Sequence, residues 1–307
     1  MSQNKIHIVF NPAAAGGKAG ENRNRILSEF RRQYRNKFEF SETHSRTDAA
    51  RIAGEAVESG YEVIIAVGGD GTVNQVVNGI LQSSCDKSSQ TRMGIISYGT
   101  GMGFSQSLGL PNDLASQIRV IKNDVSRLVD IGKIHFEGEQ SAGYFINELQ
   151  FGIGGKLSES ISPITKKMLG RFAFGFEAVK TLLNYRTSEI NIESEQISKT
   201  ENVIGVIIAN GSYTGGGMKL TPDARLNDGL FDVLIIEDMP LTARLSSFSK
   251  IYSGSHIGLP AFKLFRTRKI RFGYGNGMSV ESDGELIHYK CISAEVIPSA
   301  LSIISNN

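Results

Sequence analysis

The sequence predicts a two-domain protein, in which an α/β domain with a mostly parallel sheet precedes an antiparallel β domain. In residues 1–131, apolar segments of strand length alternate with segments whose apolar residues recur at helical spacing. This alternation is typical of a parallel sheet with helices on both faces. In residues 132–296 the apolar segments mostly lack long helices between them, which is typical of antiparallel sheets. We expect about residues 297–307 to return to the first domain.

The apolar pattern of the first domain predicts four strands and three helices. Runs of β-branched residues, or alternation of apolar and polar residues, mark the strands. Apolar residues three or four positions apart mark one face of each helix, and Thr47 is a candidate N-cap for the second helix. In chain order we expect a strand at 6–10, a helix at 22–34, a strand at 37–43, a helix from Thr47, a strand at 63–67, a helix from Thr72 and a strand at 92–97.

The second domain is predicted in the same way, from short apolar segments bounded by polar and glycine-rich stretches. Two segments have helical spacing instead, at 162–184 and 242–252. The strands are expected at 131–136, 143–149, 188–192, 203–210, 231–237, 269–274 and 287–296.

Composition excludes several classes of protein. The chain has 33 lysines and arginines against 31 acidic residues, and a nucleic-acid binder would usually show a larger basic excess. Its longest apolar runs have strand length, so no transmembrane segment is expected. We expect no signal peptide, and the separation of Cys85 from Cys291 suggests neither a metal site nor a disulfide. A reduced, cytoplasmic location is the simplest expectation.

The stretch from Gly68 to Asn74, which joins the third predicted strand to the third helix, has the sequence Gly-Gly-Asp-Gly-Thr-Val-Asn. The N-terminus of a helix presents unpaired backbone N–H groups and a partial positive charge, so it suits a bound phosphate. Glycines let the backbone approach the phosphate and allow positive φ. The alternative is a tight strand-to-helix turn without a ligand. The stretch is neither a Walker loop nor the Gly-x-Gly-x-x-Gly of dinucleotide-binding folds.

Two further loops of small residues begin at Asn11 and Gly99, each directly after a predicted strand. In parallel sheets, ligands bind at the carboxyl ends of the strands. We therefore expect these two loops and the glycine stretch at one edge of the sheet.

Short motifs along most of the chain resemble those of the diacylglycerol kinase catalytic-domain family, which includes bacterial lipid kinases and sphingosine kinases. The motifs occur in the family's order in both halves of the chain, so the resemblance does not rest on one loop. They are Asn11-Pro12, Gly68-Gly69-Asp70-Gly71-Thr72, Gly99-Thr100, Gly215-Gly216-Gly217-Met218, Pro222-Asp223-Ala224, Leu226-Asn227-Asp228-Gly229-Leu230 and Ser282-Asp283-Gly284-Glu285.

The resemblance implies a fold, a reaction and a site. The fold would be a Rossmann-like α/β nucleotide domain and a β-sandwich domain for the lipid substrate, with the active site in the cleft between them. The reaction would be an ATP- and Mg²⁺-dependent transfer of the γ-phosphate to a hydroxyl of diacylglycerol or a related lipid. Mg²⁺ would be held by Asp228 and by backbone carbonyls of Arg225 and Leu230, while Glu285 would be the general base with Asp283 beside it. The residues that would line the ATP site are Asn11, Thr43, Gly68, Gly69, Asp70, Gly71, Thr72, Val73, Asn74 and Thr100.

These residue types suit phosphoryl transfer, which needs a hard cation with oxygen ligands and a carboxylate to accept the proton of the attacking hydroxyl. Without the resemblance, Asp228 would be assigned to a simple Asn-Asp-Gly turn. Asp283-Gly284 is likewise a strong hairpin signal, and Glu285 would then be a solvated strand residue. The catalytic interpretation of these acidic residues therefore depends on the resemblance.

The sequence departs from the family at two places. Met102 and Gly103 stand where the family usually has Asn-Asp, and Gln75 stands where it has glutamate. In the family that aspartate joins a carboxylate network near the metal, of which Asp70 and Asp130 are present here. Losing one negative charge would lower the affinity for Mg²⁺, unless a water chain substitutes. The alternative function is therefore a catalytically weak or inactive nucleotide- or lipid-binding member of the family.

A lipid kinase without a transmembrane segment would meet its substrate as a peripheral protein at the inner membrane surface. Two basic segments are candidates for this contact, Lys166 to Phe176 with its interleaved phenylalanines and Lys263 to Arg271. The alternative is that these phenylalanines belong to the core and that the cations form an ordinary solvated face. A soluble substrate, as in the distantly related NAD kinases, and a homodimer through the β domain also stay open.

Overall fold

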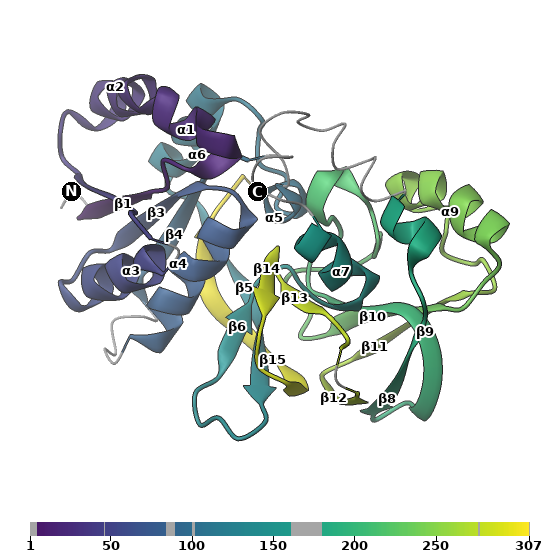
Figure 1. Cartoon of the computed structure of the whole chain (residues 1–307). Coiled ribbons are helices and arrows are strands. Elements are labelled where there is room, and N and C mark those ends of the chain that lie inside the picture. The colour runs from purple at the N-terminus through teal and green to yellow at the C-terminus, as the bar shows by residue number, and fades with distance from the viewer. Residues whose placement is uncertain are drawn as a thin grey trace. The chain divides into compact units, whose positions relative to one another are not determined.

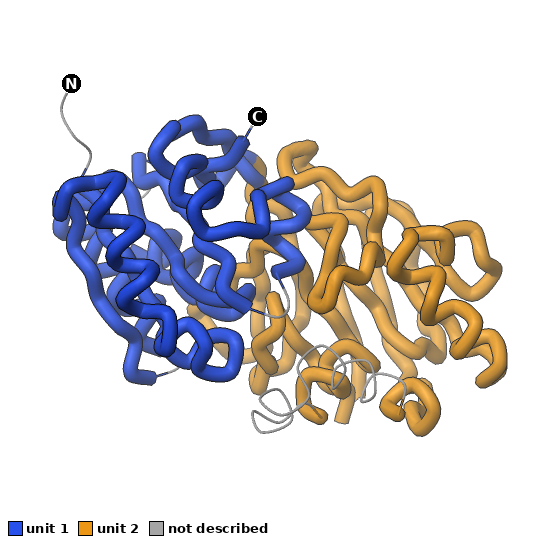
Figure 2. Tube along the Cα trace, turned by 90° about the horizontal axis from the view of Figure 1, so that it is seen from above, with its two compact units in different colours: residues 1–129, 299–307 blue, residues 130–298 orange. Residues whose placement is uncertain are grey.

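The computed structural model describes residues 5–45, 47–83, 90–99, 102–160, 180–275 and 277–306 (Figure 1). The chain divides into two compact units, residues 1–129 with 299–307 and residues 130–298 (Figure 2). Each unit is described by itself below.

The first unit is built on a parallel sheet. Its strands are β1 (Ile6–Phe10), β2 (Glu39–Glu42), β3 (Val63–Gly68), β4 (Arg92–Ser97) and the last residues of β15 (Cys291–Ile304). They lie in the order β2, β1, β3, β4, β15, and all neighbouring strands are parallel. The carboxyl ends of β1 to β4 therefore meet at one edge of the sheet, as the sequence predicts.

Helices cover both faces of this sheet. They are η1 (Ala14–Gly17), α1 (Lys18–Glu21), α2 (Arg23–Tyr34), α3 (Asp48–Glu58), α4 (Asp70–Gln82), α5 (Gly103–Ser107) and α6 (Leu114–Asn123). Figure 1 shows α3 and α4 on one face and α1, α2 and α6 on the other. With both faces covered, β3 is buried over its whole length, which explains its uninterrupted apolar sequence. α3 and α4 pack closely, because a Cβ added at Gly79 would lie 2.1 Å from the carbonyl oxygen of Ala50.

Two helix starts differ from the sequence prediction. α4 begins at Asp70 rather than at Thr72, so the aspartate belongs to the helix instead of the loop before it. Thr47 precedes α3 as predicted, but its side chain makes no capping hydrogen bond. The carboxylate of Asp48 instead accepts hydrogen bonds from two backbone N–H groups of the preceding loop. An acidic side chain in the first helical turn also interacts favourably with the helix dipole.

The second unit is a β-sandwich-like assembly of mostly antiparallel strands. Its strands are β5 (Ser126–Phe136) from residue 130 onward, β6 (Gly143–Phe145), β7 (Glu148–Gly152), β8 (Ser188–Ser194), β9 (Ser198–Ala209), β10 (Phe231–Glu237), β11 (Phe262–Thr267), β12 (Lys269–Tyr274), β13 (Val280–Ser282), β14 (Glu285–Ile287) and the first part of β15. The order is β14, β13, β7, β9, β8, β12, β15, while β10 pairs with both β9 and β11. Its helices are α7 (Ile153–Ser160), η3 (Gly215–Gly217) and α9 (Leu241–Ser253).

β9 and β10 supply both hydrophobic cores of this unit, because alternate residues of a strand point to opposite faces. Val206 and Val233 belong to the core shared with β8, β12 and β15. Ile207 and Leu234 point the other way, into a second core. Ile251 of α9 packs against that second core, so α9 covers the outer face of this part of the sheet.

The second unit follows the sequence prediction in part. The strands predicted at 231–237 and 269–274 agree with β10 and β12, and the helix at 242–252 agrees with α9. The predicted strand at 143–149 is split into β6 and β7, and 287–296 is split between β14 and β15. The helix α7 and the strands β11 and β13 were not predicted. The helix predicted at 162–184 lies mostly outside the described residues; its described part, 180–184, is helical.

Candidate functional site

The glycine loop between β3 and α4 is shaped by close packing. A Cβ at Gly68 would lie 2.4 Å from the Oγ1 atom of Thr72, so a larger residue there would displace that side chain. Gly69 has an extended backbone, and its carbonyl oxygen accepts hydrogen bonds from the N–H groups of Thr72 and Val73. Neither Gly68, Gly69 nor Gly71 has a positive φ, so the conformational freedom that glycine allows is not used at these positions, and close packing is the reason for glycine at position 68.

Asn11 and Thr72 are brought together at the carboxyl edge of the parallel sheet. The Asn11 side chain donates a hydrogen bond from Nδ2 to Thr72 Oγ1 at 2.9 Å. Its Oδ1 atom accepts from the N–H of Ala13, and its own N–H donates to the carbonyl oxygen of Val67. Thr43 follows β2 at the same edge, where its N–H donates to the carbonyl oxygen of Phe10. The edge therefore joins the ends of β1, β2 and β3 through short polar contacts.

The predicted nucleotide residues differ in what they can offer a ligand. The side chains of Thr72, Val73 and Asn74 are buried, and the apolar Val73 could contact a nucleotide only through its backbone. Thr100 lies outside the described residues, so its predicted role stays a prediction.

Asp70 holds the start of α5. Its carboxylate accepts hydrogen bonds from the backbone N–H groups of Gly103 at 3.1 Å and of Phe104 at 3.4 Å. Met102, at the N-cap position, has the left-handed φ of 52°. Where the family usually has a second carboxylate, this chain thus presents backbone N–H donors to Asp70, and these stabilise its ionised form.

The predicted metal loop, Arg225 to Leu230, is held by Asp130. The Asp130 carboxylate accepts a hydrogen bond from the N–H of Gly229 at 2.6 Å, and its N–H donates to the carbonyl oxygen of Leu226. Asp228 accepts from the N–H of Leu230 through Oδ1, while its Oδ2 lies 4.0 Å from the guanidinium of Arg266. The loop therefore has a partly exposed carboxylate in a defined conformation.

Negative charge accumulates behind this loop. Asp232 is buried, and its Oδ2 atom has no hydrogen-bond partner among the described residues, while Oδ1 accepts from Arg266 at 3.1 Å. Burial raises the pKa of Asp232, and Asp228 raises it further. A hard cation beside Asp228 would offset this charge, so the donor set fits a Mg²⁺ ion that keeps most of its water ligands. Among the described residues, no three carboxylate, imidazole or thiolate groups are arranged to hold a metal by themselves.

Asp283 lies in the tight turn of the hairpin between β13 and β14, and Glu285 is the first residue after that turn. Ser282 pairs with Glu285, and the two turn residues Asp283 and Gly284 have φ values of 48° and 84°, as a type I′ turn requires. No described residue donates a hydrogen bond to the half-exposed carboxylate of Glu285.

Asp283 has a different environment from Glu285. Its buried carboxylate accepts three backbone N–H groups, from Ile146 at 2.8 Å, Asn147 at 2.9 Å and Glu148 at 2.8 Å. These bonds occupy the oxygen atoms that a proton acceptor would need. Asp283 therefore positions the hairpin, while the accessible carboxylate is that of Glu285.

Two buried glutamates beside this hairpin were not found from the sequence. Glu148 of β7 accepts a hydrogen bond from the hydroxyl of Thr214. The side-chain amide of Gln150 donates a hydrogen bond to the same hydroxyl oxygen at 3.2 Å. Ser158 donates to Glu281 of β13 at 3.2 Å. Burial raises the pKa of Glu148 well above its ordinary value, and Glu281 and Asp283 raise it further. The sequence gives one indication of these residues, which is their position next to motifs of the family. Thr214 directly precedes Gly215-Gly216-Gly217-Met218, and Glu281 directly precedes Ser282-Asp283-Gly284-Glu285.

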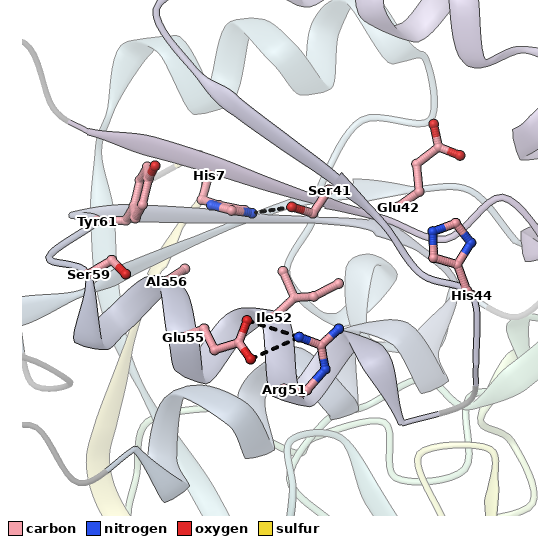
Figure 3. A pocket seen from close by; sticks show the side chains of 10 residues that line it. All are labelled: His7, Ser41, Glu42, His44, Arg51, Ile52, Glu55, Ala56, Ser59 and Tyr61. Carbon is pink, nitrogen blue, oxygen red and sulfur yellow. Dashed lines mark hydrogen bonds and ion pairs between the residues drawn. The ribbon is translucent and has the colours of Figure 1, made fainter.

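A separate polar pocket of about 490 Å³ lies on the α3 side of β1 and β2 (Figure 3). The Arg51 guanidinium there is bound to both carboxylate oxygens of Glu55, at 2.9 and 3.0 Å, and His7 shares a hydrogen bond with Ser41. Because Glu55 neutralises Arg51, the lining residues that the structure describes offer no free lysine or arginine to bind phosphate, and none of them is a predicted site residue. The lining residues are His7, Ser41, Glu42, His44, Arg51, Ile52, Glu55, Ala56, Ser59 and Tyr61.

Comparison with known families gives two matches, one for each unit. Residues 5–134 match the diacylglycerol kinase catalytic domain. Residues 149–305 match the YegS C-terminal NAD kinase beta sandwich-like domain. The predicted fold class, an α/β nucleotide-type domain followed by a β-sandwich domain, is thereby confirmed.

Curated relatives point the same way. The chain is 28% identical over 288 residues to the diacylglycerol kinase of Bacillus subtilis (strain 168), covering 92% of this chain and 89% of that protein. It is 32% identical over 245 residues to the diacylglycerol kinase of Staphylococcus haemolyticus (strain JCSC1435), covering 79% and 71%. A crystal structure of a diacylglycerol kinase from Bacillus anthracis str. Sterne has the same fold, with a TM-score of 0.72 at 20% identity over 100% of this chain and 98% of that one. No described helix is long and apolar enough to cross a membrane.

Proposed function

The chain belongs to the diacylglycerol kinase catalytic-domain family and is a lipid kinase, and from this premise we propose that it transfers the γ-phosphate of ATP, in the presence of Mg²⁺, to a hydroxyl of diacylglycerol or a related lipid. The observation that carries this proposal is the glycine loop from Gly68 to Asn74, tied through Thr72 to Asn11 at the carboxyl edge of the sheet. Backbone N–H groups at the start of α4 suit the phosphates of a nucleotide. Thr43 and Thr100 are proposed to complete the ATP site.

The acceptor chemistry is assigned to the hairpin of the second unit. The hydroxyl oxygen of the lipid attacks the γ-phosphorus, the bond from that phosphorus to the β,γ-bridging oxygen breaks, and ADP leaves. Glu285 takes the proton of the hydroxyl on its carboxylate. Asp283 keeps Glu285 in place through its three backbone hydrogen bonds.

Asp228 and the carbonyl oxygens of Arg225 and Leu230 are proposed to hold Mg²⁺. When bound, the ion would neutralise charge on the phosphates. Asp130 contributes by fixing the loop that carries Asp228, through the N–H of Gly229.

The second candidate is a weak or inactive nucleotide- or lipid-binding protein, which the replacement of the usual Asn-Asp by Met102 and Gly103 favours. Against it stands the hydrogen bonding of Asp70, whose carboxylate accepts hydrogen bonds from the N–H groups of Gly103 and Phe104. A peripheral position at the inner membrane surface and a homodimer belong to the proposal as well.

The test is transfer of label from γ-labelled ATP, with Mg²⁺, into a panel of lipids in mixed micelles, with NAD as a soluble control. The panel contains diacylglycerol, monoacylglycerol, phosphatidylglycerol and sphingoid bases. A labelled lipid would support the proposal and name the acceptor. Labelling of NAD alone would contradict it, and nucleotide binding without any labelled product would favour the second candidate.

A further inference from the structure

Helix α9 carries its large apolar side chains on the outside. Leu241, Leu245 and Tyr252 are 45%, 43% and 40% exposed, and the half-buried Phe248 is in edge-on ring contact with Tyr252. Successive members are four, three and four residues apart, so all four side chains lie on one face of the helix. We call this face, formed by Leu241, Leu245, Phe248 and Tyr252, the α9 stripe.

The face of α9 toward the core has fewer large apolar side chains than the outer face. Ser247 is the buried residue of this helix, and its hydroxyl donates a hydrogen bond to the carbonyl oxygen of Ala243. Ile251, one turn further on, packs against the core beneath. A helix that only covers a core normally points its large apolar residues inward. The distribution in α9 is the reverse, which indicates a second apolar partner for its outer face.

Charges around the stripe favour an anionic partner. The sequence from Met239 to Val280 contains no aspartate or glutamate, although the whole chain has nearly equal numbers of basic and acidic residues. Lys250 lies in the last turn of α9, and a Cβ added at Gly254, just after the helix, would lie 3.5 Å from the side chain of Lys219. The basic residues of this acid-free segment are Arg244, Lys250, Lys263, Arg266, Arg268, Lys269 and Arg271. Arg244 is paired with Asp238, just before the segment, so Lys250 is the cation of α9 that the proposal uses.

Part of the basic segment from Lys263 to Arg271 is already neutralised within the protein. Arg266 is paired with Asp232 and Lys269 with Glu295, and the membrane contact considered for this segment stays a prediction. The other predicted segment, Lys166 to Phe176, lies outside the described residues. The stripe with Lys250 is therefore the better-defined surface.

We propose that the α9 stripe lies on the surface of an anionic lipid bilayer, with Leu241 and Leu245 in the acyl boundary and Lys250 among the lipid phosphates. This rests on the proposed function, since a lipid kinase must reach an acceptor that is dissolved in a membrane. Amphipathic helices with apolar and basic residues bind in the plane of the interface in this way. A second copy of the chain fits less well, because a twofold contact would bring the same cations together.

The test measures vesicle binding by flotation, without ATP, on phosphatidylcholine vesicles with and without phosphatidylglycerol. The variant Leu241→Gln/Leu245→Gln keeps helix propensity and removes apolar surface. The matched control, Val125→Gln/Leu128→Gln, removes residues that are 42% and 51% exposed in the first unit. We expect the α9 variant to bind the anionic vesicles at least about tenfold more weakly than wild type, while the control binds as wild type does.

Lys250→Gln should weaken binding to the anionic vesicles alone and reduce its dependence on salt. Thermal unfolding of each variant checks that it is folded. The proposal is overturned if wild type does not bind anionic vesicles, or if the folded α9 variant binds them equally well. It is also overturned if the α9 variant changes only the oligomeric state, since the stripe would then be a contact between copies.

Turnover on a short-chain diacylglycerol, dissolved as monomers, separates this surface from the kinase function. The α9 variant should keep wild-type turnover on that substrate, because no residue of the stripe is assigned to the chemistry. Absence of turnover in wild type, together with vesicle binding that depends on the stripe, would defeat the proposed reaction and leave the membrane surface standing.

Discussion

The two units use carboxylates in different surroundings, half-buried at Asp70 in the first and buried at Asp283 in the second. In the first, Asp70 accepts N–H groups at the start of α5, and the neighbouring glycine loop is built mainly from backbone. In the second, Asp283 also accepts backbone N–H groups, but Glu148 and Glu281 are buried beside it and repel one another. Exposed N–H dipoles favour an anion, whereas a concentration of carboxylates favours a cation or a proton. The difference suits a division between phosphate binding and proton acceptance.

The largest expected effect tests the assignment of the proton acceptor to the second unit. Glu285→Gln should lower turnover at least about a thousandfold, equivalent to about 4 kcal/mol, because an amide cannot accept the proton. ATP binding, measured by calorimetry, should be unchanged. The matched control is Glu189→Gln on β8, which should retain wild-type turnover. Turnover of Glu285→Gln within threefold of wild type would remove Glu285 from the mechanism.

The next effect tests how Asp283 holds the hairpin. Asp283→Asn should lower the free energy of unfolding by about 3 kcal/mol, because an ionised acceptor of three buried N–H groups is lost and an NH₂ group is forced toward them. Urea denaturation measures this change. Asp238→Asn, which changes the 58% exposed partner of Arg244, should cost less than about 1 kcal/mol, because Arg244 keeps its hydrogen bonds to the carbonyl oxygens of Met239 and Tyr185. Equal losses for the two variants would contradict the positioning role.

The corresponding test in the first unit compares two adjacent glycines. Gly68→Ala places a Cβ 2.4 Å from Thr72 Oγ1 and should weaken ATP binding at least about tenfold, or about 1.4 kcal/mol. At Gly69 the nearest atom to a Cβ is 3.9 Å away and the backbone is extended, so Gly69→Ala should be tolerated better. Calorimetric titration with ATP measures both. If Gly69→Ala is the more damaging variant, the loop does not bind phosphate in the described conformation.

A smaller effect concerns the pH dependence of stability from the buried glutamates. The folded protein holds a proton on the Glu148 and Glu281 pair above the ordinary pKa of 4.5, so the stability that this proton contributes is lost as pH rises above that value. Glu148→Gln removes this loss. Between pH 5 and pH 8 the wild type should therefore lose at least about 1.4 kcal/mol relative to the variant, measured by denaturant unfolding. Glu193→Gln, exposed on β8, should give no such difference.

The smallest effect is expected where the chain departs from its family. Met102→Asn/Gly103→Asp restores the usual pair, but Asp70 already has two N–H partners, so turnover should change less than about threefold. Radiolabel transfer under the conditions of the lipid panel measures it. A gain of more than tenfold would show that the natural chain is impaired and would favour the second candidate function.

Sequence reasoning succeeded where local pattern and tertiary environment agree. β10 and β12 were predicted with their bounds, because β-branched and aromatic residues there fit strands whatever their partners. β11 is not predictable in the same way, because basic residues interrupt its apolar pattern and are equally typical of a charged surface. α7 has three small residues in its first turns and lacks the apolar periodicity of a predictable helix.

The sequence predicts more of the candidate site in the first unit than in the second. The glycine loop could be found because its residue types are needed by the backbone geometry itself. Glu148 and Glu281 could not, since an isolated acidic residue in a strand is normally solvent-facing, and only the neighbouring strands determine that these two are buried. The reason for glycine at position 68 was also inaccessible, because it depends on where the Thr72 side chain packs.

By itself, the sequence determined the α/β and β organisation, the order of the family's motifs and the position of the loop after β3, because these follow from local periodicity and residue type. The tertiary structure alone decided which carboxylates are acceptors of N–H groups and which remain accessible, and that α9 turns its leucines outward. These properties depend on contacts between segments far apart in the chain. Asp283 meets the backbone of Ile146 only after β13 has paired with β7, so its role is a property of the folded sheet.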